Sequence, residues 1–161
     1  FEEGLPTGGA ELLEKFSKSY LKLNTSLAER APWTLAHQDF RVENMLFGNP
    51  ENDEVVVIDW QGIGRGPGVY DLAYLLGGSM EIELRRENEK ALVASYHDEL
   101  CSNGVEGYSF DSAWDDYGYE MILQINKLVD ERESITEVGK DSFCWANMAS
   151  HWYVWLGKNN L

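Results

Sequence analysis

Near the start of the chain, apolar residues recur at three- and four-residue spacing between positions 11 and 27. The repeating positions are Leu12, Leu13, Phe16, Tyr20, Leu23 and Leu27. A helix gathers positions at this spacing on one face, so the pattern predicts an amphipathic helix that packs against a core. Ala31-Pro32 ends this helix, and the apolar run Thr34-Leu35-Ala36 then predicts one short buried strand.

Two β-prone runs come next, at 45–47 and 55–58, and a segment dense in turn-forming residues separates them. This arrangement predicts a β-hairpin. The stretch 62–68 alternates glycine with other residues. We expect it to be a loop, because a glycine-rich sequence sustains neither a helix nor a strand.

From residue 70 onward the pattern of apolar and polar positions is helical. It predicts helices at 70–76, 81–100, 111–129 and 139–156, with Ser102-Asn103-Gly104 as one of the breaks. A few early strands followed by helices favour an α+β fold that is mostly helical. We expect one domain spanning residues 1–161.

The formal charge of −15 argues against a nucleic-acid partner, because such partners are bound through clustered Lys and Arg. Cys101 and Cys144 are isolated, so neither a disulfide framework nor a zinc knuckle is expected. No apolar run is long enough to span a bilayer, and the N-terminus does not resemble a signal peptide. We therefore expect a cytoplasmic protein with no membrane partner. Because the first residue is Phe1 and not Met, we also expect a processed, trimmed or partial gene product.

The candidate chemistry lies in the block from His37 to Asn44, together with Asp59 beyond the hairpin. If the hairpin strands pair antiparallel, Asn44 just before the first and Asp59 just after the second emerge at the same end. A carboxylate and an amide oxygen side by side suit Mg²⁺, which prefers oxygen ligands. Asp39, on the loop leading into the hairpin, lies near that end. A carboxylate there can orient an attacking hydroxyl and accept its proton.

This order of residues, H-x-D-x-x-x-x-N followed by a hydrophobic strand ending in D-W, resembles the catalytic and metal motifs of protein kinases. It is more closely similar to the aminoglycoside phosphotransferase and choline kinase-like family, whose D-L-A helix start resembles the sequence after Tyr70. The resemblance implies that Asp39 is the catalytic base. It also implies that Asn44 and Asp59 hold Mg²⁺ and the phosphates of ATP, with GTP as an alternative nucleotide. In such an enzyme His37 has a structural role and Asp71 braces the catalytic loop.

The architecture implied by the resemblance is a protein-kinase-like C-terminal lobe. A small hairpin carries the catalytic loop (37–44) and the metal-binding Asp59, and a helical subdomain (70–161) supports them. We expect the nucleotide-covering N-terminal lobe to be missing from these residues, because the sequence contains no V-A-I-K-like lysine, no strand-borne Gly-rich nucleotide loop and no P-loop. We expect a phosphotransferase that moves the ATP γ-phosphate to a hydroxyl of a small molecule, and that is inactive or nearly so without the missing lobe or a partner segment.

One departure from the family is Gln38, which stands where the phosphotransferases usually carry Gly. We expect it to alter the packing of the loop without removing a proposed metal ligand.

An acidic pair, Asp116 and Glu120, lies near the start of a predicted helix with Trp114 beside it. Like charges four residues apart repel one another, which favours a cationic acceptor such as an amino sugar or a quaternary ammonium compound. The helix dipole offers a simpler account of the first-turn carboxylates Asp111 and Asp115.

Other readings remain open. Asp39 alone fits a loop or capping carboxylate, and the glycines at 62–68 fit either a phosphate cradle or a segment like the kinase activation segment. The chain as a whole also fits a non-catalytic binding or regulatory module, which the missing N-lobe motifs favour and the set of Asp39, Asn44 and Asp59 opposes. A more distant alternative is a metal-dependent hydrolase that uses His37, Asp39 and Asp59.

Overall fold

The structure is a computed structural model that describes residues 9–30 and 32–132. Its helices are α1 (Gly9–Arg30), α2 (Val69–Ser79), α3 (Ile82–Ser102) and α4 (Phe110–Arg132). Its strands are β1 (Trp33–Ala36), β2 (Met45–Phe47), β3 (Val55–Val57) and β4 (Gly64–Pro67), with 3₁₀ turns at Val42–Asn44 and Trp60–Gly62. The α+β, mostly helical fold predicted from the sequence is therefore present, and the helix predicted at 139–156 lies outside the described residues.

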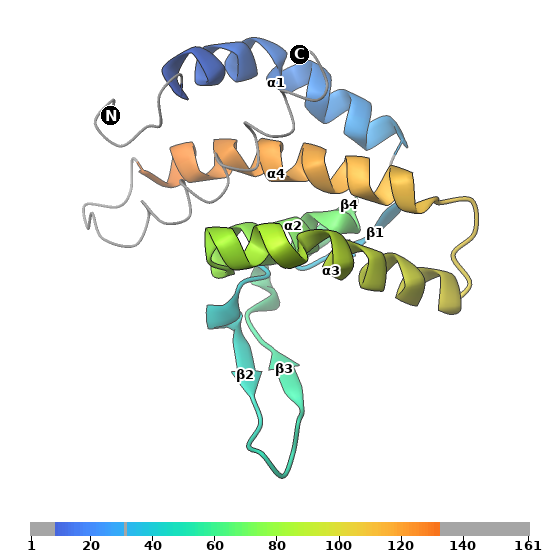
Figure 1. Cartoon of the computed structure of the whole chain (residues 1–161). Helices are drawn as coiled ribbons and strands as arrows, with labels where there is room; N and C mark the ends of the chain where they lie inside the picture. The colour runs from blue at the N-terminus through green and yellow to red at the C-terminus, as the bar shows by residue number, and fades with distance from the viewer. Residues whose placement is uncertain (1–8, 31, 133–161) are drawn as a thin grey trace.

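The strands form two separate antiparallel ribbons, β1 with β4 and β2 with β3. In the hairpin β2–β3, Met45 pairs with Val57 and Phe47 with Val55, as the hairpin prediction requires. Figure 1 shows this hairpin extending away from the helices, while β1 and β4 lie against them. The hairpin side chains Leu46, Phe47, Val55 and Val56 are accordingly exposed.

The prediction of a loop across 62–68 is wrong for Gly64–Pro67, which pair with β1 as β4. A glycine-rich segment has little strand preference of its own, so pairing with a neighbour decides its conformation. The absence of a side chain matters at Gly64, where a Cβ would collide with the side chain of Gln38. A Cβ at Gly66 would make only ordinary contact with the Cβ of Ala36, at 3.9 Å.

The strand predicted from Thr34-Leu35-Ala36 is present, but the expectation that it is buried is wrong for most of it. Ala36 is buried, whereas Leu35 is 67% exposed. Among the described residues, β1 pairs only with β4, and they leave this two-stranded ribbon without cover on both faces.

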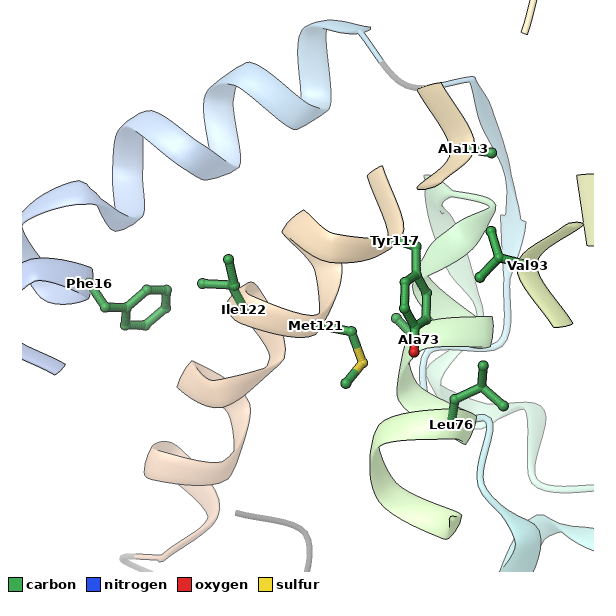
Figure 2. Packing of buried hydrophobic residues seen from close by; sticks show 8 residues of the cluster. All are labelled: Phe16, Ala73, Leu76, Val93, Ala113, Tyr117, Met121 and Ile122. Carbon is green, nitrogen blue, oxygen red and sulfur yellow. The ribbon is translucent and has the colours of Figure 1, made fainter. Parts of the chain in front are cut away.

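The core lies between the helices, with α4 in the middle. Helix α4 contacts α1, α2 and α3, and Figure 1 shows α1 on one side of α4 and α2 with α3 on the other. Figure 2 shows the buried cluster, which takes one residue from α1, two from α2, one from α3 and four from α4: Phe16, Ala73, Leu76, Val93, Ala113, Tyr117, Met121 and Ile122. The predicted amphipathic helix therefore packs as expected, with Phe16 and Leu27 buried.

A polar network joins α3 to α4 inside this core. The Tyr117 hydroxyl donates a 3.1 Å hydrogen bond to Glu89, and Arg85 Nε lies 3.5 Å from the same carboxylate. Burial is the main cause that lowers the pKa of Arg85, while Glu89 opposes it. The pairing with Glu89 keeps the buried guanidinium compensated.

Helix α3 ends at a glycine. Gly104 has φ +89°, a left-handed conformation that glycine adopts without strain, and its N–H donates to the carbonyl of Cys101. The break predicted at 102–104 therefore has a clear structural cause. None of the helices in the described part of the chain has both the length and the apolar content needed to cross a membrane.

Candidate active site at the base of the hairpin

The base of the hairpin holds Asn44 and Asp59 at the same end, as the antiparallel pairing requires. The backbone N–H of Ile58 donates a 2.9 Å hydrogen bond to the carbonyl of Asn44, one residue beyond the Met45–Val57 pair. Asn44 ends the 3₁₀ turn Val42–Asn44, and Asp59 directly precedes the turn Trp60–Gly62. The two residues that the sequence proposed as metal ligands are thus neighbours across the ribbon.

Asn44 is also bound to the loop that carries Asp39. Its side-chain Nδ2 donates to the backbone carbonyl of Asp39 at 2.9 Å and to Asp39 Oδ2 at 2.9 Å. Asn44 is only 8% exposed, and this pair of bonds orients its amide. Because the amide nitrogen faces Asp39, the amide oxygen is the atom left to accept from a cation or another donor.

Asp59 has a left-handed backbone, with φ 62° and ψ 56°. For a residue other than glycine this conformation is costly, although Asn and Asp adopt it more readily than most. It separates strand β3 from the following turn and leaves the Asp59 side chain exposed at the hairpin base. Backbone strain at a polar residue is frequent at functional sites, and here it falls on a proposed ligand.

His37 connects the two halves of this site. It is 1% exposed, its Nδ1 accepts from the N–H of Asp39 at 3.3 Å, and its Nε2 lies 2.8 Å from the carbonyl of Ile58. A neutral ring with the proton on Nε2 satisfies both contacts. Since both ring nitrogens face protein groups, His37 has no nitrogen left for a metal, which argues against the hydrolase reading.

Asp71 lies in the first turn of α2 and holds the start of the catalytic loop. Its Oδ2 accepts from the backbone N–H of His37 at 2.7 Å, and its Oδ1 accepts from that of Gln38 at 2.9 Å. Hydrogen bonds to a carboxylate are stronger than those between neutral groups. The loop is therefore tied to the helical body by both oxygens of one side chain.

Gln38 also has a left-handed backbone, with φ 68°. The phosphotransferases that the sequence resembles usually carry Gly here, and Gly reaches this conformation at no steric cost. The prediction that Gln38 changes loop packing fits its surroundings, because its side chain fills the space beside Gly64.

Within the described residues, no group of three or more His, Cys, Asp and Glu side chains is arranged to hold a metal ion. An amide oxygen from Asn44 and a carboxylate from Asp59 form a sparser set, with the character that a hard cation such as Mg²⁺ prefers. Mg²⁺ usually keeps several waters and shares substrate phosphates, so few protein ligands are consistent with it.

The acidic pair on α4 lies elsewhere. Asp116 is buried and accepts a 2.9 Å hydrogen bond from the Tyr108 hydroxyl, and Trp114 stacks on Tyr117 with 5.6 Å between ring centroids. Glu120 is 3% exposed and lines a separate pocket on α4. Burial, then the charges of Asp116 and Asp71, raise the pKa of Glu120 to about 8. Asp116 and Glu120 are therefore buried close enough for their charges to interact, and of the three residues Glu120 alone is among those that line this pocket.

Sequence pattern alone did not single out Gln124, which lies one turn beyond Glu120 and lines the same pocket. Its Nε2 donates a 2.9 Å hydrogen bond to the carbonyl of Tyr70 at the start of α2. The only available signal was the four-residue spacing from Glu120, which places both side chains on one helix face.

The comparisons with known proteins bear on this site directly. The profile of the ecdysteroid kinase-like family matches residues 5–104, more than half of the chain. No curated protein and no solved structure matched. The matched residues include the catalytic loop, the hairpin, Asp59 and Asp71, and they end before α4. That family lies within the protein-kinase-like superfamily, in agreement with the motif order that the sequence shows. The matched region contains the hairpin, the loop 37–44 and Asp71, and the chain belongs to the ecdysteroid kinase-like family.

Proposed function

We propose that the chain is the catalytic lobe of a small-molecule kinase that transfers the γ-phosphate of ATP to a hydroxyl group. The observation that carries this proposal is the hydrogen bond from Asn44 to the Asp39 carboxylate at the base of the hairpin that also presents Asp59. Membership of the ecdysteroid kinase-like family supports the same reaction class. Phosphoryl transfer depends on positioning and charge stabilisation, which such a polar cluster supplies.

In this proposal Asn44 and Asp59 hold a magnesium ion together with the nucleotide phosphates. Their fit rests on the donor set, since the oriented amide of Asn44 turns its oxygen away from Asp39 and Asp59 contributes an exposed carboxylate. When bound, the ion neutralises charge on the phosphates. The left-handed backbone at Asp59 fixes where its carboxylate lies relative to β3.

Asp39 is the proposed catalytic base. It accepts a hydrogen bond from Asn44 through one oxygen, and Arg41 Nε lies 3.8 Å from the other. The carboxylate can take a proton from an acceptor hydroxyl as the oxygen of that hydroxyl attacks phosphorus. Its position is set by Asp71, which ties the preceding two backbone N–H groups to α2.

The acceptor is proposed to be a small alcohol, and no nucleic acid or membrane takes part. The family description points to ecdysteroids as one class of hydroxylated acceptor to test. The formal charge of −15 supports amino sugars and choline-like cations as a second class. GTP is the alternative nucleotide.

A non-catalytic binding module is the second candidate. It is favoured by the sequence itself, which contains no Gly-rich nucleotide loop and no V-A-I-K-like lysine in its 161 residues. On the kinase proposal, these missing parts predict weak turnover by the chain alone, because an open nucleotide site admits water.

The test is calorimetric titration of MgATP into the chain, into Asp59→Asn and into the matched control Asp53→Asn. Asp53 is an exposed carboxylate in the loop of the same hairpin. We expect the wild type and Asp53→Asn to bind, and Asp59→Asn to lose about tenfold or more in affinity. Transfer of radiolabelled phosphate to an ecdysteroid, an aminoglycoside or choline would then identify the acceptor class. Absence of MgATP binding by the wild type would reject the kinase and leave the binding module.

A further inference from the structure

A pocket of about 440 Å³ lies between α1, the β1–β4 ribbon, the start of α2 and α4. This volume is within the range of small-molecule sites. Its lining includes the buried residues Leu27, Glu120 and Gln124, and the exposed residues Trp33 and Arg65. The exposed residues mark the side open to solvent, and the buried ones mark the inner wall.

Glu120 is the unusual group on that inner wall. It is 3% exposed, yet no hydrogen bond or ion pair engages its carboxyl group within the described residues. A buried carboxyl group with no partner is costly, and this one has Asp116 and Asp71 near enough to disfavour its ionised form. A neutral carboxyl group carries a proton that it can donate, and it keeps an oxygen that can accept.

Gln124 gives an independent sign at the same pocket. It is 2% exposed, its Nε2 is occupied by the carbonyl of Tyr70, and its Oε1 is buried with no donor among the described residues. A buried acceptor left in this state costs about 1–3 kcal/mol. Two polar side chains one helical turn apart thus each have an oxygen with no hydrogen-bond partner among the described residues where they line one pocket.

The pocket also adjoins the catalytic loop. Gln38 lines it, and Gln38 directly precedes Asp39. Tyr70, which directly precedes Asp71, also lines the pocket. Its backbone carbonyl accepts the hydrogen bond from Gln124. A molecule held here therefore lies beside the segment that carries the proposed base.

The charge of the lining disfavours a cation. The Arg65 guanidinium is already present in the wall, 5.3 Å from the centroid of the Trp33 ring. A ligand ammonium would meet this positive charge and would require Glu120 to ionise. A hydroxyl group needs neither change, because it can accept from the Glu120 carboxyl and donate to an oxygen in return.

We propose that this pocket binds an uncharged, hydroxyl-bearing molecule through Glu120, with Gln124 as the second polar contact. The role of the bound molecule rests on the proposed function: it is the phosphoryl acceptor. The recognition of a neutral alcohol replaces the cationic acceptor that the acidic pair suggested from sequence alone.

The test uses two probes of matched size, trans-cyclohexanediol and trans-aminocyclohexanol, titrated into the full chain near neutral pH without nucleotide. Amide chemical shifts around the pocket report binding. We expect the diol to bind better than the amine, Glu120→Gln to keep the diol, and Glu120→Leu to weaken it about tenfold. A blocking variant, Ala28→Phe, covers the case in which Glu120→Leu does not fold, because Ala28 is exposed on α1 and lines the pocket.

The outcomes separate the pocket from the reaction. Preferential binding of the amine, lost in Glu120→Gln, would overturn the proposal in favour of a cation site. Shifts that persist in Ala28→Phe, or no shifts with either probe, would also overturn it. If the diol binds as expected but no alcohol is phosphorylated, the proposed function fails and the pocket stands. If Ala28→Phe leaves phosphoryl transfer unchanged, the pocket does not bind the phosphoryl acceptor.

Discussion

The amide of Asn44 donates a 2.9 Å hydrogen bond to the carboxylate of Asp39, joining a proposed metal ligand to the proposed base. Replacing Asn44 by Asp would set two carboxylates at this distance. We expect Asn44→Asp to lower the free energy of unfolding by about 1–3 kcal/mol near neutral pH, because a donor is lost and like charges meet. Urea denaturation at several pH values measures this change in the free energy of unfolding.

The pH dependence distinguishes repulsion from simple loss of the bond. Repulsion raises the pKa of the carboxylate pair in the folded state, so the deficit of Asn44→Asp should shrink as the pH falls. Asn44→Ala loses the same bond without adding charge, so its deficit should shrink less steeply as the pH falls. If the stabilities of the two variants change with pH in parallel, the side chains at positions 39 and 44 are farther apart in solution.

Asp59 offers a variant that separates ligand chemistry from backbone strain. Its left-handed φ of 62° is better tolerated by Asn than by Ala. We expect Asp59→Asn to keep stability within about 0.5 kcal/mol and Asp59→Ala to lose about 1 kcal/mol. Both should weaken MgATP binding equally, as measured by urea unfolding and calorimetry. Retained MgATP affinity in Asp59→Asn would remove Asp59 from the ligand set.

The hairpin and its polar base could be predicted from the sequence because their signals are local. Turn formers between two β-prone runs set the pairing, and pairing alone brings Asn44 beside Asp59. The ribbon β1–β4 could not be predicted in this way. Its glycines have no strand preference, and their partners Thr34 and Ala36 lie far upstream in the chain.

The surroundings of Glu120 also could not be predicted from the local sequence pattern. Its spacing from Asp116 suggested two charges that repel each other and favour a cation, but the fold buries Glu120 on the wall of a pocket that α1 and the ribbon also line. Burial favours the neutral form of a carboxyl group, so the chemistry changes from cation binding to hydrogen bonding. Which face of α4 is covered depends on elements distant in sequence, and a helical period does not specify this.

Asp71 provides a test of how the catalytic loop is held. Both carboxylate oxygens accept from backbone N–H groups, those of His37 and Gln38. In Asp71→Asn one acceptor becomes an NH₂ group that faces a donor. We expect a loss of about 2–3 kcal/mol in the free energy of unfolding.

Hydrogen exchange localises the effect of Asp71→Asn. The amides of His37 and Gln38 should lose protection more than the amides of α3, which Asp71 does not bind. Glu83→Gln, an exposed carboxylate in the first turn of α3, is the matched control for removing a helix-terminal charge. Uniform loss of protection along the chain would indicate general destabilisation in place of a specific brace.

Glu120 predicts an inverted pH dependence of stability. Its pKa is raised from 4.5 to about 8 on folding, so between these values the folded state holds a proton that the unfolded state has released. The stabilising contribution is complete below pH 4.5 and is lost as the pH rises through about 8. For Glu120 the free energy of unfolding falls by roughly 3–5 kcal/mol over this pH range. Ordinary carboxylates act in the opposite direction at lower pH.

Glu120→Gln removes the titrating group while keeping its shape and its capacity to donate. We expect this variant to be more stable than the wild type above pH 8 and to differ little from it near pH 5, as measured by urea denaturation across the range. Asp115→Asn, an exposed carboxylate on the same helix, should leave the wild-type profile unchanged. If wild type and Glu120→Gln show the same slope between pH 5 and 8, then the Glu120 carboxyl group is ionised in the folded protein over this range, and the prediction is wrong.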